Sequence, residues 1–468
     1  MILNFSEIKR NFARTDQEFY QKKIRALLLA NKIKIIVLDD DPTGMQTVHG
    51  CLILTNWEKS NILKAFNHAE PVFYVLTNTR SHNAEKAETI ITSVITNLIE
   101  TSIDLPYKTL IISRSDSTLR GHFPLEPILI KKLLLDWNFK LHYPIFFIPA
   151  LFEAGRCTYA DCQYIVDNDH LIPVAETEFA KDSFFGYKSS NLYDFIRERT
   201  DNTIEKKDIA SLSINAIRHS DNFDLSGKIE DNREKQFFVV NAIDYYDLCK
   251  FSYNMLGLLI KNNSSVIFRS SSSFVKAISG IESKPLLKKG DMVDHNGPGL
   301  FLVGSYTKKT STQLNQLLLC RDTAGIELNV DSALKNPMSV INDIISQIKN
   351  VTDNGITPVV FTSRNIIHSD EKNTFLEIGT KISSVFIKLV KDLPFIPSYV
   401  VAKGGITAHN VLAKGFEIQI SIVDGQILPG VPVIKMKTNQ INNQIPLIIF
   451  PGNVGNSNSL KEVFGILH

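Results

Sequence analysis

The chain of 468 residues has almost no net charge, because 51 lysines and arginines are balanced by 49 aspartates and glutamates to leave a formal charge of +2. This balance gives no electrostatic case for nucleic-acid binding. No apolar run reaches the ~18–20 residues that a membrane helix needs, so we expect no membrane partner. The five cysteines are scattered and odd in number, and Cys157 and Cys162 have no neighbouring ligands typical of zinc. We therefore expect reduced thiols in a cytoplasmic protein.

The composition that remains, 44% hydrophobic and 21% charged, is that of a soluble globular protein. The length is too great for one ordinary core and favours two domains. The stretch 282–298, rich in Lys, Gly, Asp and Asn, is the best candidate for a break. We predict an N-terminal domain at 1–285, a linker at 286–298 and a C-terminal domain at 299–468. Residues 1–31 read as charged leading helices rather than a signal peptide.

Short, continuous apolar runs, each followed by polar residues, recur along the chain. Such runs are typical of parallel strands buried on both faces. Helical stretches lie between them, for example 83–101, where Asn83 is a suitable N-cap. We predict an α/β fold of two domains, each with a mainly parallel sheet flanked by helices, and an active site in the cleft between them. The main predicted strands are Ile33–Leu38, Val72–Thr77, Thr109–Ser113, Tyr143–Ile148, Phe237–Val240, Val266–Phe268, Leu300–Val303, Val359–Thr362, Ser398–Ala402 and Pro446–Phe450.

Three carboxylates, Asp39, Asp40 and Asp41, arrive at the end of the run Ile33–Leu38. Ligands of open α/β sheets bind at the carboxyl ends of strands. Adjacent like charges repel, so at least one carboxylate is expected to have a raised pKa or to hold a cation or a substrate hydroxyl. The alternative is a plain acidic turn closed by Pro-Thr-Gly.

The polar turns after the next strands carry groups of both charges that complement the acidic turn. Three guanidiniums are suited to a bidentate grip on a substrate carboxylate: Arg80, Arg114 and Arg120. Three carboxylates are suited to take a proton or to hold sugar hydroxyls: Asp40, Asp41 and Asp116. Neutral hydrogen bonds are available from Asn78, Ser115, Ser117 and Thr118. The alternative for Arg80 and Arg120 is that they neutralise the acidic turn as buried ion pairs, and His49 and His122 are more typical of structural histidines.

The second half offers three glycine-containing turns between a strand and a helix: Gly304-Ser305, Gly404-Gly405-Ile406-Thr407 and Pro451-Gly452-Asn453-Val454-Gly455. Glycine lets backbone N–H groups approach an anion closely, and a helix N-terminus adds unpaired donors. Together the turns predict a phosphate or nucleotide cradle. Neither a P-loop nor a dinucleotide fingerprint is present, which disfavours a common NTPase or a Rossmann dehydrogenase.

Four motifs occur in order: Asp40–Gly44, Asp116–Gly121, Gly404–Ala408 and Pro451–Gly455. Together they resemble the four-carbon acid sugar kinase family, from about Ile33 to the C-terminus. The resemblance implies an acid-sugar-binding N-terminal domain and a nucleotide-binding C-terminal domain. It also implies ATP-dependent, Mg²⁺-assisted phosphorylation of a hydroxyl, normally O4, on a tetronate such as threonate, erythronate or 3-oxo-tetronate.

By the same resemblance the sugar site takes Asp40, Asp41, Asp116 and Arg120, with Thr43 in the first motif. The ATP site takes Ser305, Gly404, Gly405, Ile406, Thr407 and Gly452, with Asn453 in the last motif. We predict Asp41 or Asp40 as the residue that orients or deprotonates the attacking hydroxyl, and favour Asp41 because it is nearest the turn. Ile406 stands where many members carry an acid, which removes one magnesium or ribose contact.

The sequence is also compatible with two other functions. One is a nicotinamide-dependent oxidoreductase of a small hydroxy acid, and the other is a non-catalytic acid-sugar-binding protein. In each case the expected partner is a small acid rather than nucleic acid or membrane, and a homodimer is compatible with the sequence.

Overall fold

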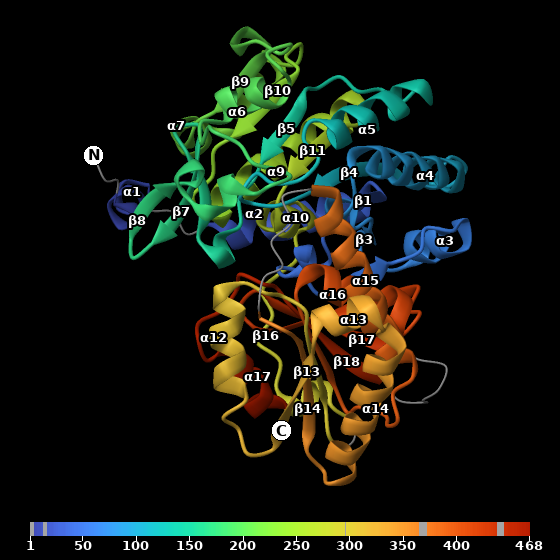
Figure 1. Cartoon of the computed structure of the whole chain (residues 1–468). Helices are drawn as coiled ribbons and strands as arrows, with labels where there is room; N and C mark the ends of the chain where they lie inside the picture. The colour runs from blue at the N-terminus through green and yellow to red at the C-terminus, as the bar shows by residue number, and fades with distance from the viewer. Residues whose placement is uncertain (1–3, 13–15, 295, 365–371, 438–443) are drawn as a thin grey trace. The chain divides into compact units, whose positions relative to one another are not determined.

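The computed structural model describes residues 4–12, 16–294, 296–364, 372–437 and 444–468 (Figure 1). The chain divides into two compact units. The first holds Met1–Asp40 and Trp57–Ser283, and the second holds Asp41–Asn56 and Lys284–His468. The predicted scheme of consecutive domains lacks this excursion, in which 41–56 leave the first unit and join the second.

The first unit is built on parallel strands, and each strand predicted for it is present. The strands follow the order β3-β1-β4-β11-β5-β10-β9, and all neighbours are parallel. β1 is buried at every position, as the continuous apolar run predicts. The bounds are β1 (Ile33–Asp39), β3 (Val72–Leu76), β4 (Lys108–Arg114), β5 (Ile145–Ile148), β9 (Ile209–Leu212), β10 (Phe237–Val240) and β11 (Ile267–Ser270).

Helices of the first unit pack in two rows, one of α3, α4 and α5 and the other of α2, α9 and α10 (Figure 1). The prediction for Asn83 is confirmed, because its side chain accepts a hydrogen bond from the N–H of Lys86 at 3.0 Å and caps α4. The helices are α2 (Gln17–Ala30), α3 (Lys59–Asn67), α4 (Ala84–Ser102), α5 (Leu125–Asp136), α6 (Leu192–Arg199), α7 (Ile214–His219), α8 (Asn222–Glu230), α9 (Tyr245–Asn262) and α10 (Ser272–Ser279).

A small antiparallel sheet, which the sequence analysis did not predict, also belongs to the first unit. It contains β6 (Arg156–Tyr159), β7 (Cys162–Asp167) and β8 (His170–Pro173). The helix α1 (Phe5–Asn11) packs beside it through Ile8, which joins Cys157 and Leu171 in a small core.

The second unit has a mixed sheet. Its parallel part follows the order β13-β14-β12-β15-β18, in which β12, β14, β15 and β18 are predicted strands and β13 is not, and antiparallel strands β17, β16 and β2 extend it. The sequence analysis did not predict β16. In the structure, buried and less buried residues alternate along this strand, which is the pattern of an antiparallel strand. The bounds are β2 (Leu52–Leu54), β12 (Leu300–Val303), β13 (Thr323–Leu328), β14 (Thr357–Thr362), β15 (Val400–Lys403), β16 (Ile420–Leu428), β17 (Val431–Lys437) and β18 (Gln444–Phe450).

Helices flank this sheet on both sides, with α12 and α17 on one and α13, α14 and α15 on the other (Figure 1). The predicted linker 286–298 is packed, because Leu287 and Met292 are buried in the same core as Phe301. None of the helices in the described ranges is long and apolar enough to cross a membrane. The helices are α11 (Lys289–Met292), α12 (Lys308–Leu317), α13 (Val330–Lys335), α14 (Pro337–Asp353), α15 (Lys372–Lys391), α16 (Gly405–Asn410) and α17 (Ser459–Leu467).

A lysine, Lys403, is fully buried at the end of β15. Its Nζ donates to the carbonyl oxygens of Pro451 at 2.7 Å and Gly452 at 3.4 Å, and it lies 3.9 Å from the centroid of the Phe450 ring. Burial, with a smaller effect of Lys309, lowers the pKa of this ammonium from 10.5 to about 6.

This shift predicts a pH-dependent stability of the second unit. The unfolded chain binds the extra proton between pH ~6 and ~10.5, so the free energy of unfolding rises with pH in that window. Against a Lys403→Met variant, we expect wild-type stability to rise by up to about 1.4 kcal/mol per pH unit. Both tryptophans, Trp57 and Trp137, lie in the first unit. Tryptophan fluorescence would therefore not report on the second unit, and the measurement is hydrogen exchange of peptides from β15 and β18 at pH 6.5, 7.5 and 8.5. A difference in unfolding free energy between wild type and Lys403→Met that does not change with pH would contradict the prediction.

Candidate functional site

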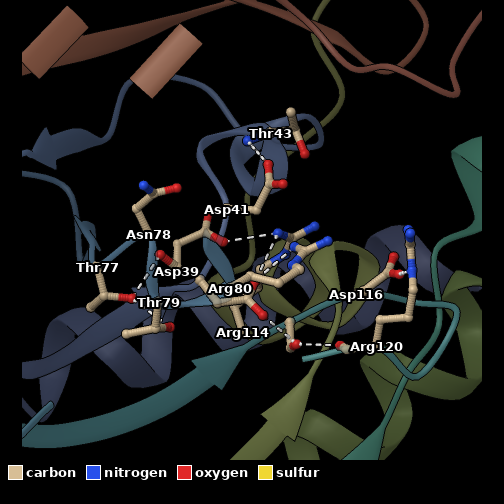
Figure 2. Close-up of polar contacts among 12 residues, drawn as sticks. Asp39, Asp41, Thr43, Thr77, Asn78, Thr79, Arg80, Arg114, Asp116 and Arg120 are labelled. Carbon is tan, nitrogen blue, oxygen red and sulfur yellow. Dashed lines mark hydrogen bonds and ion pairs between the residues drawn. The ribbon is translucent and has the colours of Figure 1, made fainter. Parts of the chain in front are cut away.

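Two buried aspartates at the end of β1 are paired with arginines (Figure 2). Arg114 donates to Asp39 at 2.9 Å, and Arg80 donates to Asp40 at 2.7 Å. The second oxygen of Asp40 accepts a hydrogen bond from the Ser115 hydroxyl at 2.5 Å. Arg80 therefore neutralises the acidic turn as a buried ion pair, which is the alternative given above. Arg114 does the same with Asp39.

The sheet register brings these groups together. Asp39 of β1 and Arg114 of β4 are direct partners on neighbouring parallel strands. Arg80 follows β3 in a short 3₁₀ turn, Thr79–Ser81, which Asn78 opens in the left-handed conformation with φ 51°. The Asn78 side chain donates to the Ser81 hydroxyl at 2.8 Å and so supports this turn. Adjacent strand ends thus supply both signs of charge, as the sequence predicts.

Asp116 and Arg120 form a second ion pair, with Nε and Oδ2 2.6 Å apart (Figure 2). Thr118 also donates to Asp116, and Asp182 lies 3.5 Å from the Arg120 guanidinium. Burial alone would raise the pKa of Asp116, but the charges of Arg120 and Arg80 and these hydrogen bonds outweigh burial and hold the pKa well below its usual range. Asp116 is therefore ionised at neutral pH and acts as an acceptor.

Gly121 closes this motif, and the structure gives the reason for a glycine there. Its φ is +119°, and a Cβ at this position would overlap the Ser115 hydroxyl and lie 2.8 Å from Oδ2 of Asp40. The same Cβ would lie 3.0 Å from the guanidinium of Arg269. Any side chain at Gly121 would therefore push apart groups of the cluster.

The sequence analysis missed the buried pair of Arg269 and Glu126. Arg269 donates to Glu126 at 2.6 Å and to the Ser113 hydroxyl at 2.7 Å. The other Glu126 oxygen accepts from the Thr79 hydroxyl at 2.5 Å. Arg269 lies at the carboxyl end of β11, the position that identified the other candidate residues, and could have been selected on that ground. Glu126 lies in the first turn of α5, where the sequence pattern does not distinguish it.

The backbone of Ser117 and Thr118 is held by residues distant in sequence. Gln163 donates from Nε2 to the Ser117 carbonyl at 2.8 Å, and the Tyr187 hydroxyl donates to the Thr118 carbonyl at 2.7 Å. His122 contacts the carbonyls of Thr79 and His82 through Nε2, the arrangement of a structural histidine. These contacts fix the loop that carries Asp116.

Asp41 belongs to the second unit and lies against the glycine turn after β15. Its carboxylate accepts a hydrogen bond from the N–H of Thr43 at 2.8 Å (Figure 2). A Cβ on Gly405 would lie only 2.6 Å from Oδ2 of Asp41. The short 3₁₀ helix Pro42–Met45 is thus packed on α16, and only a glycine at 405 leaves room for the carboxylate.

The other predicted glycine turns converge on Ser305. A Cβ on Gly452 would lie 3.2 Å from the Ser305 hydroxyl, and one on Gly404 would lie 3.3 Å from its Cβ. Gly404 has φ +115°, which favours glycine. A side chain on Gly304 would overlap the hydroxyl of Thr407. The second unit therefore brings the three turns together, as the strand order predicts.

Thr407, Ile406 and Asn453 are the other predicted positions at these turns. Gly404 occupies the N-cap of α16, and Thr407 lies within the helix. Ile406 is 49% exposed. Asn453 offers its carbonyl to the Lys309 ammonium at 3.2 Å.

Two basic side chains of the second unit, Lys403 and Arg364, also lie at the turns. Lys403 fixes the carbonyls of Pro451 and Gly452. Arg364, which follows β14, donates to the Ser305 carbonyl at 2.8 Å, and burial lowers the pKa of its guanidinium. Both stand at strand ends that the sequence analysis located, but neither was selected as a site residue.

The predicted site residues therefore form two sets. The first unit holds Asp40, Asn78, Arg80, Ser115, Asp116, Ser117, Thr118 and Arg120. The second holds Asp41, Thr43, Ser305, Gly404, Gly405, Ile406, Thr407, Gly452 and Asn453. Asp40 and Asp41, which the resemblance assigns to one sugar site, belong to different units.

Comparison with known proteins gives matches to both halves. Residues 35–278 match the sugar-binding N-terminal domain family, and residues 300–460 match the nucleotide-binding C-terminal domain family. No curated protein matches the chain.

Solved structures share the fold at low sequence identity. One is a protein from Salmonella typhimurium LT2 with the provisional name of a tRNA synthase, at 13% identity and a TM-score of 0.64, with 92% of this chain and 98% of that chain covered. Another is Haemophilus influenzae protein HI1011, at 16% identity and a TM-score of 0.61, with 92% and 100% covered. Taken with the two domain matches, these findings place the chain in the family that joins a sugar-binding N-terminal domain to a nucleotide-binding C-terminal domain, the architecture of the four-carbon acid sugar kinases.

Proposed function

We propose that the chain is an ATP-dependent kinase that phosphorylates a hydroxyl, O4 by family resemblance, of a four-carbon acid sugar such as threonate, erythronate or 3-oxo-tetronate. The observation that carries the proposal is the division of one acidic motif between the two units. Asp40 belongs to the arginine-rich cluster, and Asp41 packs against Gly405 in the nucleotide-binding half. Consecutive Cα atoms are about 3.8 Å apart, so one turn supplies carboxylates to both half-sites.

The sugar half-site is suited to a small polyhydroxy acid. Asp116 stays ionised and accepts hydrogen bonds from substrate hydroxyls. Arg120 and Arg80 hold positive charge beside it. Ser115 and Thr118 orient these groups through their hydroxyls.

Asp41 is the better candidate to act on the attacking hydroxyl. Both oxygens of Asp40 are engaged, one by Arg80 and the other by Ser115, and the residue is 1% exposed. Asp41 is less buried and stands beside the glycine turn where the nucleotide phosphates are proposed to bind. We assign Asp40 to orientation of the cluster and Asp41 to orientation or deprotonation of the substrate hydroxyl.

The glycine turns fit ATP. Gly404 and Gly452 carry no side chain and both lie against Ser305, so these turns bring backbone N–H groups and one hydroxyl together, which is the chemistry of a phosphate cradle. Mg²⁺ would be held mainly through the phosphates, as is usual for this ion, and would neutralise charge on the group being transferred. The exposed Ile406 offers it no side-chain ligand. The interdomain cleft, the cytoplasmic location and a homodimer stay predictions.

The direct test is incubation of the purified protein with ATP, Mg²⁺ and a panel of four-carbon acids, followed by mass spectrometry. We expect one acid to gain a single phosphoryl group, with a matching release of ADP. Acid binding without phosphoryl transfer would favour the non-catalytic alternative, and NADH binding in a fluorescence titration would favour the oxidoreductase.

A first prediction from this assignment concerns Asp41→Asn. The amide keeps the shape but cannot accept the proton, so we expect kcat to fall by about 10²–10⁴-fold. ATP affinity, measured by calorimetry, should change little because the backbone amides remain. Retained turnover would remove Asp41 from the mechanism.

A second prediction concerns Gly405→Ala. The new methyl group would displace the Asp41 carboxylate, so we expect a loss of turnover comparable to that of Asp41→Asn. Gly465→Ala is the matched control, because Gly465 is an exposed residue of α17 with nothing within 4 Å of an added Cβ. Alanine there should leave kcat unchanged and add slightly to stability. Equal activity of both variants would contradict the packing of Asp41 on this turn.

A further inference from the structure

Arg156 is an arginine of the sugar-binding half that no motif of the sequence analysis includes. It begins β6 and pairs with Ile165 of β7, so its backbone is fixed in the small antiparallel sheet. Gly155 before it adopts φ +68°, and a Cβ there would lie 3.1 Å from the Val166 carbonyl oxygen. The guanidinium lies near enough to Asp116 for the charge of that carboxylate to act on it.

The guanidinium of Arg156, a residue of intermediate burial, has few partners. Its NH1 donates to the Ala154 carbonyl at 2.7 Å, and its Nε is buried with no hydrogen-bond partner in the described part of the chain. No carboxylate among the described residues forms an ion pair with it. Burial lowers the pKa of this guanidinium and the nearby charge of Arg120 lowers it further, although Asp116 opposes them.

The other arginines that act on Asp116 are already paired. Arg80 has Asp40 at 2.7 Å, and Arg120 has Asp116 at 2.6 Å and Asp182 at 3.5 Å. Arg156 alone in this group lacks a close carboxylate among the described residues. A partly buried cation whose Nε has no hydrogen-bond partner among the described residues can still accept an anion, and a bound carboxylate would supply both the missing partner and the opposite charge.

Arg156 and Arg120 also share one aromatic neighbour. Their guanidinium carbons lie 5.9 Å and 5.0 Å from the centroid of the Phe179 ring. A planar guanidinium held against a ring keeps its N–H edge in a defined orientation, which suits bidentate binding of a carboxylate. Arg156, Arg120 and Phe179 come from three separate segments of the first unit.

We propose that Arg156 binds the carboxylate of the acid-sugar substrate, with Arg120 beside it, and so makes the enzyme select acids over neutral sugars. This inference rests on the proposed kinase function and adds the residue that recognises the acid. Anchoring the acid through C1 leaves the hydroxyl on C4 at the opposite end of the four-carbon chain. That geometry agrees with transfer to O4 rather than to a hydroxyl next to the carboxylate.

The test compares wild type with Arg156→Met and Arg156→Lys on the acid that the panel identifies and on its tetronamide, in which a neutral amide replaces the carboxylate. We expect Arg156→Met to raise KM for the acid by tenfold or more and to bring the acid and the amide close to equal kcat/KM. KM for ATP should stay within twofold. Arg156→Lys, which keeps the charge but not the fork, should fall between wild type and Arg156→Met.

Arg197→Met is the control, because Arg197 is a part-exposed arginine of α6 that pairs loosely with Asp194 at 3.8 Å. It should behave as wild type. An Arg156→Met enzyme that keeps its KM for the acid, or keeps its preference for acid over amide, overturns the inference while leaving the kinase proposal intact. Should Arg156→Met fail to fold, as judged by circular dichroism, the lysine variant decides: an acid KM equal to that of wild type overturns the inference.

A binding experiment without ATP distinguishes failure of the kinase proposal from failure of this inference. If no acid is phosphorylated, calorimetric titration of the same acids without ATP still tests Arg156. Binding that weakens tenfold or more in Arg156→Met supports the carboxylate site in a protein of another activity. Equal binding in both proteins, or no acid binding by wild type, overturns it.

Discussion

The sugar-binding half depends on the pairing of buried carboxylates with guanidiniums at the carboxyl edge of a parallel sheet. Asp39 and Arg114 have side chains that are 0% and 3% exposed, and Glu126 and Arg269 are both 3% exposed. Neither charge is tolerable alone, because removing one partner of such a pair costs about 3–5 kcal/mol. The pairing is possible because strand ends of a parallel sheet meet at one edge. The charged residues at the strand ends can therefore be buried only in a fold that brings those ends together.

This pairing also determines which groups remain for a substrate. A carboxylate with both oxygens engaged, such as Asp40, has little capacity left. Under the proposed function, recognition of the substrate would therefore fall to the less buried members, Asp116 and Arg120, and to Arg156. The nucleotide-binding half is organised differently, because its glycine turns pack around the small side chains of Ser305 and Thr407.

The sequence predicted the features that depend on local pattern. The buried parallel strands, the Asn83 cap and the convergence of glycine turns follow from apolar runs, capping chemistry and the common edge of parallel strands. It did not predict the small antiparallel sheet or the membership of Asp41 in the second unit. Both depend on contacts between residues far apart in the chain. Arg156 was missed for the same reason, because nothing local distinguishes it from any surface arginine.

Asp40 and Asp41 show where local reasoning ends. As neighbours with the same side chain they look equivalent in the sequence, yet Asp40 is tied to Arg80 and Asp41 to the turn at Gly405. Both residues follow β1, which ends at Asp39, and Asp41 already forms the N-cap of the 3₁₀ helix Pro42–Met45. The motif is thereby divided between the two units, a division that the sequence pattern does not reveal.

In the proposed kinase, the two halves would recognise their ligands by different parts of the chain. The sugar-binding half would use side chains, which change with substitution, whereas the nucleotide-binding half would use backbone at glycine turns, where the exposed Ile406 adds no polar group. Side-chain recognition can change the acid that is accepted without altering the nucleotide cradle. Solved structures share this fold at 13% and 16% identity, so the fold itself tolerates substitution at most of its positions.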